Sequence, residues 1–284
     1  IYKSIFFELS SKENQDEIKK EFPKESIHRR NTGYAVDEFL ISDLFGGTEE
    51  SINPAKFLSG SEGTLVFSTA ITIQLDDLPP TQGIMVCPHF TSVNESLKAT
   101  VTAMNHKLYA CELMDKVILD CTKNNREQAK NRFFLQGDPE AVLMLEVSAN
   151  TIEEAETLAK KLIEDLKINN FGYHYPKVYG DDIAKVHYLR KAGLGLLGNI
   201  VGDMKAVACI EDTAVALEDL PEYIEEFTQI MDKYQQDAVY YAHAGAGELH
   251  LRPILNLKKQ EDVALFRKIT TETAELVKKY QGSF

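Results

Sequence analysis

The sequence contains no tryptophan and only four cysteines among 284 residues. No single motif in it identifies a functional class by itself. The cysteines, at 87, 111, 121 and 209, form no Cys-x-x-Cys pair, which argues against a disulfide framework and against an iron–sulfur cluster in this segment. This usage predicts free thiols in a reducing compartment. No window approaches the roughly 18 consecutive apolar residues that a transmembrane helix needs.

Basic residues are scarce relative to acidic ones. Lysine and arginine total 31 against 44 aspartates and glutamates, which gives a net charge of −13. Phosphate binding needs clustered lysine and arginine, so nucleic acid is not expected as a partner, and neither is an anionic membrane surface. An anionic small molecule would need cations gathered locally against this background.

The organisation changes near residues 75–82, where two acids and the pair Pro79-Pro80 interrupt any regular element. Before this boundary, residues 1–8 and 66–73 have β-rich patterns that predict strands. After it, apolar strand-like runs alternate with helical patterns; Thr151, followed by Glu153 and Glu154, predicts the start of a helix that runs to residue 168. The pattern predicts an α+β domain with helices on a sheet, and ferredoxin-like units are one arrangement that fits it.

Two histidines, His243 and His250, flank the small-residue turn Ala-Gly-Ala-Gly-Glu-Leu. Strand-like runs on both sides indicate a hairpin in which the two imidazoles converge on one point. Converging imidazoles suit a divalent metal, although most protein sites have three or more ligands. The alternative is a hairpin whose histidines hydrogen-bond to backbone and are purely structural.

Three cations, Arg190, Lys205 and Arg252, stand near otherwise apolar elements. In an acidic protein such residues are candidates to hold a carboxylate substrate, and arginine can do so with two parallel hydrogen bonds. The alternative is that each pairs with a local acid such as Glu211 or Asp212.

Two loops before the boundary have the composition of anion-binding turns. Residues 29–37 combine Arg29 and Arg30 with a turn at residues 31–33, and residues 60–65 contain two glycines. Ordinary solvated turns have the same composition, and no Walker motif follows either loop.

Taken together and in order, the segments 29–37, 60–65 and 243–250 resemble those of the FAD-linked oxidase family. This family includes bacterial D-lactate dehydrogenases, glycolate oxidase flavoprotein subunits and D-2-hydroxyglutarate dehydrogenases. Residues 211–215 also resemble a segment of the longer members, which fuse the flavin module to an iron–sulfur module. The chain is similar to an internal piece of such an enzyme.

The resemblance implies an α+β protein: the second half of a two-subdomain FAD-binding fold at residues 1–78, followed by a ferredoxin-like cap or substrate domain at 83–284 that is truncated at its C-terminal end. It implies FAD and a divalent metal of the zinc, iron or manganese class as cofactors. The implied residues are Asn31, Thr32, Gly33, Tyr34, Gly60, Ser61, Glu62, Gly63 and Thr64 for FAD, His243 and His250 for the metal, and Arg190, Lys205 and Arg252 for the substrate.

The implied activity is oxidation of a D-2-hydroxy acid such as lactate, glycolate or 2-hydroxyglutarate, by hydride transfer to flavin. The family's catalytic base and third metal ligand are expected beyond Phe284, and its pyrophosphate segment before Ile1. We therefore expect this segment alone to be inactive and to bind FAD poorly, and the missing flanks to be its partners. The expected location is cytoplasmic, or peripheral at the membrane in the intact enzyme.

Two other functions are compatible with the residues. The first is a non-catalytic α+β module that binds a ligand or docks a partner and whose histidines are structural. The second is a metal-dependent hydrolase built on the two histidines, which lacks a motif such as His-Glu-x-x-His. Convergence of His243, His250 and Arg190 on one cleft beside the loops of Tyr34 and Glu62 would favour the enzyme.

Overall fold

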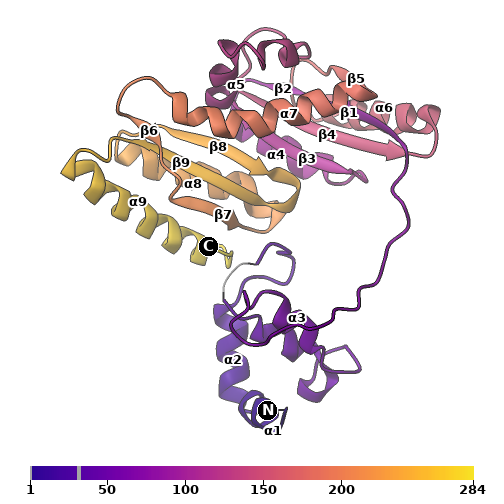
Figure 1. Ribbon diagram of the computed structural model, residues 1–284, viewed down its shortest axis with the longest axis vertical. Helices are drawn as coiled ribbons and strands as arrows, with labels where there is room; N and C mark the ends of the chain where they lie inside the picture. Colours follow the sequence, from indigo (N-terminus) through magenta and orange to yellow (C-terminus); the bar gives the residue numbers. More distant parts are fainter. Residues whose placement is uncertain (1, 31–32) are drawn as a thin grey trace.

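The computed structural model describes residues 2–30 and 33–284. A small, mainly helical N-terminal region is joined by the extended residues 64–81 to a larger α+β domain (Figure 1). The larger domain is built on one nine-stranded sheet whose strand pairs are antiparallel. The α+β class predicted from the sequence is confirmed.

The helices are α1 (Tyr2–Leu9), α2 (Lys12–Glu21), α3 (Pro54–Ser59), α4 (Val93–Ala103), α5 (Lys116–Lys123), α6 (Ile152–Ile168), α7 (Asp181–Leu196), α8 (Leu220–Lys233) and α9 (Gln260–Lys279). The strands are β1 (Gln82–Val86), β2 (His89–Phe90), β3 (Ala110–Asp115), β4 (Ala141–Ala149), β5 (Lys177–Tyr179), β6 (Lys205–Ala206), β7 (Ile210–Ala214), β8 (Ala238–His243) and β9 (Glu248–Leu255). Within the described residues, no helix is both long enough and apolar enough to cross a bilayer.

The N-terminal region has a small core of its own. Leu9 of α1 is buried with Phe39 and Phe45, and Ile5 packs against them. The strand predicted over residues 1–8 is wrong, because Ile5 and Leu9 stand four residues apart and meet this cluster from one side of a helix. The region also touches the larger domain: Ile27 is buried against Ala214 and Ala216.

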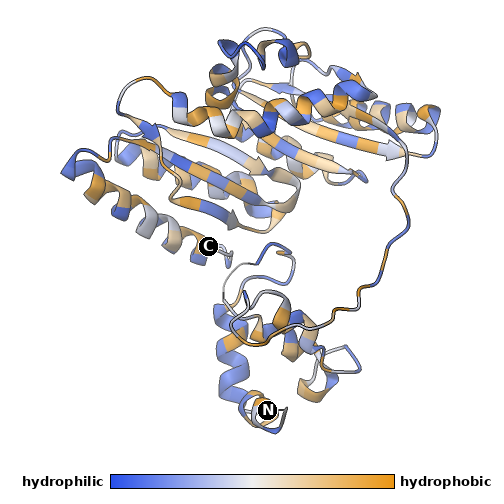
Figure 2. Ribbon diagram, in the orientation of Figure 1, coloured by the Kyte–Doolittle hydropathy of each residue, from blue (hydrophilic) through white to orange (hydrophobic). Residues whose placement is uncertain are grey.

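The strand predicted over residues 66–73 is also wrong. These residues are extended but belong to no strand, and several apolar side chains along them face solvent, with Phe67 91% exposed and Ile71 77% exposed. Figure 2 shows orange, apolar positions along this segment, away from the sheet. A β-prone sequence forms a stable strand only when a neighbouring strand pairs with it, and none does so among the described residues.

The sheet of the larger domain consists of two similar units. Apart from the short β2 and α5, the chain of the first unit runs β1-α4-β3-β4-α6-β5, and the strands lie in the order β5-β1-β4-β3. This is the ferredoxin-like arrangement. In the second, the chain runs β7-α8-β8-β9-α9, with the order β8-β9-β7. The units join edge to edge through β3 and β8, which pair at Leu113–Ala242 and Met114–Tyr241.

The core lies on both faces of the sheet. On one face, helices α4, α6, α8 and α9 bury Leu97, Leu162, Phe227 and Ile269 against the strands. On the opposite face, α5 and α7 pack on it, and α7 crosses in front of the strands in Figure 1. Each fully buried side chain of this size contributes about 1.5–3 kcal/mol of transfer free energy, so the two apolar layers hold the sheet rigid.

Candidate functional site

The hairpin of β8 and β9 places both histidines on one face of the sheet. Tyr241 pairs with His250 and His243 pairs with Glu248. Side chains alternate between faces along a strand, so these four residues point the same way. Gly247 closes the turn with φ +67°, and a Cβ atom there would lie 2.3 Å from the Val215 carbonyl oxygen, which only glycine avoids.

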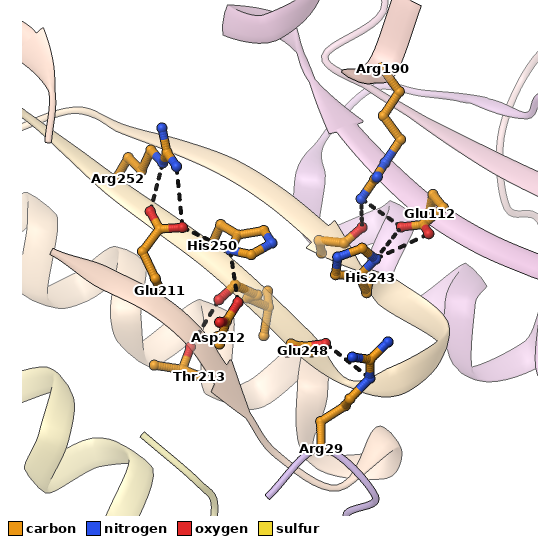
Figure 3. A network of polar contacts seen from close by, with 12 residues as sticks. Arg29, Glu112, Arg190, Glu211, Asp212, Thr213, His243, Glu248, His250 and Arg252 are labelled. Carbon is orange, nitrogen blue, oxygen red and sulfur yellow. Dashed lines mark hydrogen bonds and ion pairs between the residues drawn. The ribbon is translucent and has the colours of Figure 1, made fainter. Parts of the chain in front are cut away.

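The two imidazoles converge as the sequence predicts. Their ring centroids are 5.5 Å apart and the rings are inclined at 71°. In Figure 3 they lie between Glu112 on one side and Glu211 on the other. The His243 side chain is 35% exposed and that of His250 12%, so a small molecule can reach this part of the sheet.

Glu112 holds His243 from the neighbouring unit. It lies on β3, two residues before Met114, which pairs with Tyr241 on β8, so Glu112 and His243 share a face across the junction. The Nδ1 atom of His243 lies 3.1 Å from the Glu112 carboxylate, and the same carboxylate lies 2.6 Å from a guanidinium nitrogen of Arg190. One carboxylate therefore fixes a histidine and an arginine.

Arg190 reaches this point from α7. Gly193, one turn later, lets the helix approach α5 closely, since a Cβ there would lie 2.5 Å from Ile118. The guanidinium donates to the Ala242 carbonyl oxygen at 3.0 Å and lies 4.1 Å from the centroid of the Tyr241 ring. Its buried Nε has no hydrogen-bond partner among the described residues. A buried donor without a partner is uncommon in a folded protein and marks a candidate contact for a ligand.

Glu211 and Asp212 hold His250 because β7 is bulged. Ile210 pairs with Leu251 and Thr213 with Leu249, so two residues of β7 stand opposite His250 alone. Asp212 takes the left-handed conformation, with φ +59°. The Nδ1 atom of His250 lies 2.9 Å from Glu211 and 3.2 Å from Asp212, both as ion-pair contacts and neither as a well-aligned hydrogen bond.

Arg252 completes this side of the site. It forms two hydrogen bonds to Glu211, at 2.7 and 3.2 Å. Burial raises the pKa of Glu211, but the contacts with His250 and Arg252 outweigh burial and hold it below its usual value. Glu211 is therefore an ionised group at neutral pH.

The three predicted substrate cations have different surroundings. Arg252 pairs with Glu211, which is the local pairing considered as the alternative, and Arg190 pairs with Glu112. Lys205 makes its hydrogen bonds elsewhere, to the carbonyl oxygens of Gly198 and Ile200. The two arginines thus belong to one polar network with the histidines, whereas the hydrogen bonds of Lys205 hold the turn after α7.

The two loops predicted to bind the cofactor meet one another in the N-terminal region. Tyr34 and Thr64 are joined by a 2.8 Å hydrogen bond between their hydroxyl groups. Gly33 and Gly63 both have positive φ, whereas Gly60 does not, and Ser61 is buried and hydrogen-bonds to Leu58. Glu62 is exposed. Asn31 and Thr32 lie outside the described residues.

A hollow of about 370 Å³ opens beside the first loop. Its walls include Gly33, Arg30 and Lys56, and Arg30 forms ion pairs with Asp37 and Glu38. Burial raises the pKa of Asp37, and the neighbouring Arg30 opposes this. The hollow is thus polar and mixed in charge.

Arg29 connects this region to the histidine hairpin. Its Nε lies 3.2 Å from Glu248, whose side chain is only 4% exposed (Figure 3). Arg29 stands four residues before Gly33, so the segment that leads into the first loop lies directly beside the turn between the histidines. Neither Glu248 nor Glu112 was among the residues predicted from the sequence. The one available signal for Glu112 was a charged residue within an otherwise apolar strand.

The metal site predicted from the two histidines is incomplete within this chain. Among the described residues, no group of three or more histidine, cysteine or acidic side chains is arranged to hold an ion. The Nδ1 atoms of both histidines lie against carboxylates, which leaves one Nε2 atom on each ring. The pair could therefore offer two nitrogen ligands. The four cysteines are free thiols and lie in separate places.

Comparison with known proteins assigns the family. Residues 79–284 match the model of the FAD linked oxidases, C-terminal domain. The chain belongs to this family. Its relatives include two proteins named D-2-hydroxyglutarate dehydrogenase, from Haemophilus influenzae and Pseudomonas putida, each 29% identical over 95% and 93% of the chain. The resemblance noted from the three motifs is confirmed.

The chain spans about a quarter of the length of these relatives, 27% and 26% respectively. Among solved structures, p-cresol methylhydroxylase with substrate bound is similar with a TM-score of 0.47 and 11% identity, over 78% of this chain and 52% of that one. The residues matched by the family model, 79–284, make up the larger domain of this chain. That domain carries His243, His250, Arg190 and Arg252.

Proposed function

We propose that this chain is part of an FAD-dependent dehydrogenase that oxidises a D-2-hydroxy acid. The family is one of FAD-linked oxidases, and the curated relatives named above are D-2-hydroxyglutarate dehydrogenases. The observation that carries the proposal is the gathering of His243, His250, Arg190 and Arg252 on one face of the sheet, linked through two glutamates.

The charged groups of the site support an acidic substrate. Two guanidinium groups stand in a site that is partly shielded from water, in a protein of net charge −13. The Nε–H of Arg190 has no partner among the described residues, and arginine binds carboxylates through parallel hydrogen bonds. We assign Arg190 to the carboxylate next to the reacting carbon and Arg252 to a second acidic group, while Lys205 stays a prediction from the sequence because its hydrogen bonds hold the turn after α7. A dicarboxylate such as 2-hydroxyglutarate uses both cations, and lactate or glycolate uses one.

The flavin, when bound, supplies the hydride acceptor for the substrate carbon. We propose that the loops at residues 31–34 and 60–64 contact it. The hydrogen bond between Tyr34 and Thr64 joins these loops, and their glycines allow close approach of a ligand to the backbone. Arg29 fixes the first loop beside the hairpin, which would keep the cofactor and the substrate residues in one arrangement.

His243 and His250 are the residues that would hold a divalent ion of the zinc, iron or manganese class. Such an ion, when bound, would lower the pKa of the substrate hydroxyl as a Lewis acid. The histidines supply at most two of its ligands, and we assign no catalytic base to the described residues. Their own contribution is to present two nitrogens on paired strands, with His243 immediately before the turn and His250 three residues after Gly247.

The division into domains is part of the proposal. We propose that residues 1–78 are a portion of an FAD-binding domain and that residues 83–284 are the cap or substrate domain. The small core of the first region and the exposed apolar residues of the extended segment support this, because such a segment is stabilised only when another strand covers it. The flanking polypeptide of a longer enzyme would provide that cover. We propose a location in the cytoplasm or at a membrane surface for the intact enzyme.

The alternative is a non-catalytic module with structural histidines. This alternative predicts that the histidine and arginine side chains lie on separate surfaces. They lie instead in one polar network on one face of the sheet. The direct test uses the full-length polypeptide that contains this chain. The reduction of its FAD by each substrate is measured anaerobically through the loss of flavin absorbance. D-2-hydroxyglutarate should bleach the flavin, D-lactate or glycolate should do so more slowly, and R190A should slow all three. Absence of bleaching with every D-2-hydroxy acid would exclude the proposed activity.

A further inference from the structure

Each of the two histidines lies against a glutamate that also contacts an arginine. Glu112 contacts His243 and Arg190, and Glu211 contacts His250 and Arg252 (Figure 3). In both cases the glutamate touches the Nδ1 atom of the histidine and the guanidinium of the arginine. The arrangement repeats although the two glutamates come from different strands and different units of the sheet.

Each glutamate is placed by a specific feature of the backbone. Glu112 faces His243 because β3 and β8 pair across the junction of the two units. Glu211 faces His250 because the extra residue in β7 directs two consecutive carboxylates at one imidazole. The left-handed Asp212 that this bulge requires costs about 1–2 kcal/mol for a residue with a Cβ. Bulges of this kind are common beside functional sites.

The contacts favour one position for the proton of each neutral imidazole ring. A carboxylate at neutral pH only accepts hydrogen bonds, so the Nδ1 atom beside it must be the protonated one. The aligned hydrogen bond belongs to His243 and Glu112, whereas the Nδ1 atom of His250 lies within 3.2 Å of two carboxylates as ion-pair contacts only. A neutral imidazole with its proton on Nδ1 has its lone pair on Nε2, which is the atom left to meet a metal ion or a proton.

We propose that Glu112 and Glu211 are positioning residues that fix both histidines in the Nδ1–H tautomer, so that the two Nε2 lone pairs face a common ligand. Each glutamate also holds one arginine, so the ligand-binding nitrogens and the substrate-binding cations are set in place together. This inference rests on the proposed function for its purpose, but the tautomers themselves can be measured without any substrate.

The experiment is long-range proton–nitrogen NMR of the imidazoles in the metal-free protein at neutral pH, followed by titration with Zn²⁺. The wild-type protein should show the Nδ1–H tautomer at both histidines. E112Q should shift His243 towards the Nε2–H tautomer, since a glutamine amide can donate to Nδ1, and should leave His250 unchanged. E211Q should do the reverse. Each should weaken Zn²⁺ binding by about 10- to 100-fold, the usual effect of losing such a partner.

The matched control is E146Q. Glu146 of β4 contacts His187 at 3.0 Å and lies outside the network, so this variant should affect His187 alone. A milder second variant, D212N, removes the more exposed of the two carboxylates at His250 and should produce a smaller shift than E211Q.

The outcomes separate the two proposals. If the histidines keep the same tautomers in E112Q and E211Q, or if the wild-type rings carry Nε2–H, the positioning role is overturned whatever the protein binds. If the tautomers shift as expected and Zn²⁺ does not bind even to the wild-type protein, the positioning role stands and the metal assignment fails.

Discussion

The Nδ1 atom of His243 lies 3.1 Å from Glu112, although 131 residues separate them in the sequence. The contact joins the edge strands of two units, β8 and β3, and the same carboxylate reaches Arg190 on α7. Three elements that are far apart along the chain therefore determine the position of one imidazole.

Replacing Arg190 with lysine should weaken binding of D-2-hydroxyglutarate by about tenfold to a hundredfold. Lysine keeps the charge, but it cannot contact Ala242, Glu112 and a substrate carboxylate with one planar group. A lost hydrogen bond to a charged group is worth about 1.5–3 kcal/mol. Calorimetric titration gives the affinity, and R267K, on the exposed part of α9, is the control and should bind as the wild type does. Equal affinities for R190K and R267K would contradict this role.

Removing Arg29 should destabilise the fold more than an exposed arginine normally does. R29A leaves the buried Glu248 carboxylate without its counter-charge. Because Arg29 is itself half exposed, we expect about 1–2 kcal/mol, below the 3–5 kcal/mol of a fully buried pair. Urea unfolding of R29A, E248Q and the double variant forms a cycle. The double variant should be more stable than R29A; simple additivity of the two changes would show that the pair is not coupled.

Two glycines in α7 should respond in opposite ways to alanine. G193A drives a methyl group into Ile118, at 2.5 Å, and should cost about 1–3 kcal/mol. G195A meets nothing within 4 Å and should stabilise the helix by about 0.5–1 kcal/mol, because alanine is the better helix former. Thermal unfolding of the two variants provides the measurement. If both variants shift the midpoint in the same direction, α7 does not pack on α5 as described.

Asp115 should make stability depend on pH. Burial raises the pKa of the Asp115 carboxyl group from the ordinary 3.8 to about 7. The carboxyl group also accepts hydrogen bonds from the backbone N–H groups of Ile118 and Tyr240, and these lower its pKa and offset part of the effect of burial. The folded state thus binds the proton more tightly than the unfolded state. The resulting stabilisation is fully present below about pH 4 and is lost as pH rises through 7.

D115N removes this titration, so its stability should vary less than that of the wild type between pH 4 and pH 7. It should also be less stable at pH 4, since the amide cannot accept from both backbone groups and an unsatisfied donor costs about 1–3 kcal/mol. Urea unfolding at several pH values measures both effects. Parallel pH profiles for the two proteins would exclude Asp115 as the source.

Local patterns were enough to predict some of these features. The small residues between His243 and His250 predict a turn, and strand alternation predicts that the two imidazoles share a face. Thr151 caps α6 as expected, accepting from the Glu154 N–H. These predictions succeed because the physics that decides them acts over a few residues.

Other features depend on contacts that a single sequence does not display. The partner of His243 is Glu112, which becomes its neighbour only when the two units join. The bulge in β7 moves Glu211 to the face of His250. Strict alternation would instead place Glu211 on the face of Thr213, opposite to that of His250, so the sequence pattern does not predict this contact. Residues 66–73 have strand composition but no neighbouring strand, and the two ferredoxin-like units share an arrangement without a visible sequence repeat.

The junction between β3 and β8 has a further consequence. Only two residue pairs form this ladder, whereas six pairs join β3 to β4 and six join β8 to β9. One of the shortest ladders of the sheet therefore lies beneath the imidazoles, at the junction of the two units. A transient separation there would part Glu112 from His243 while each unit kept its own longer ladders, so the contact between the units is lost before either unit unfolds.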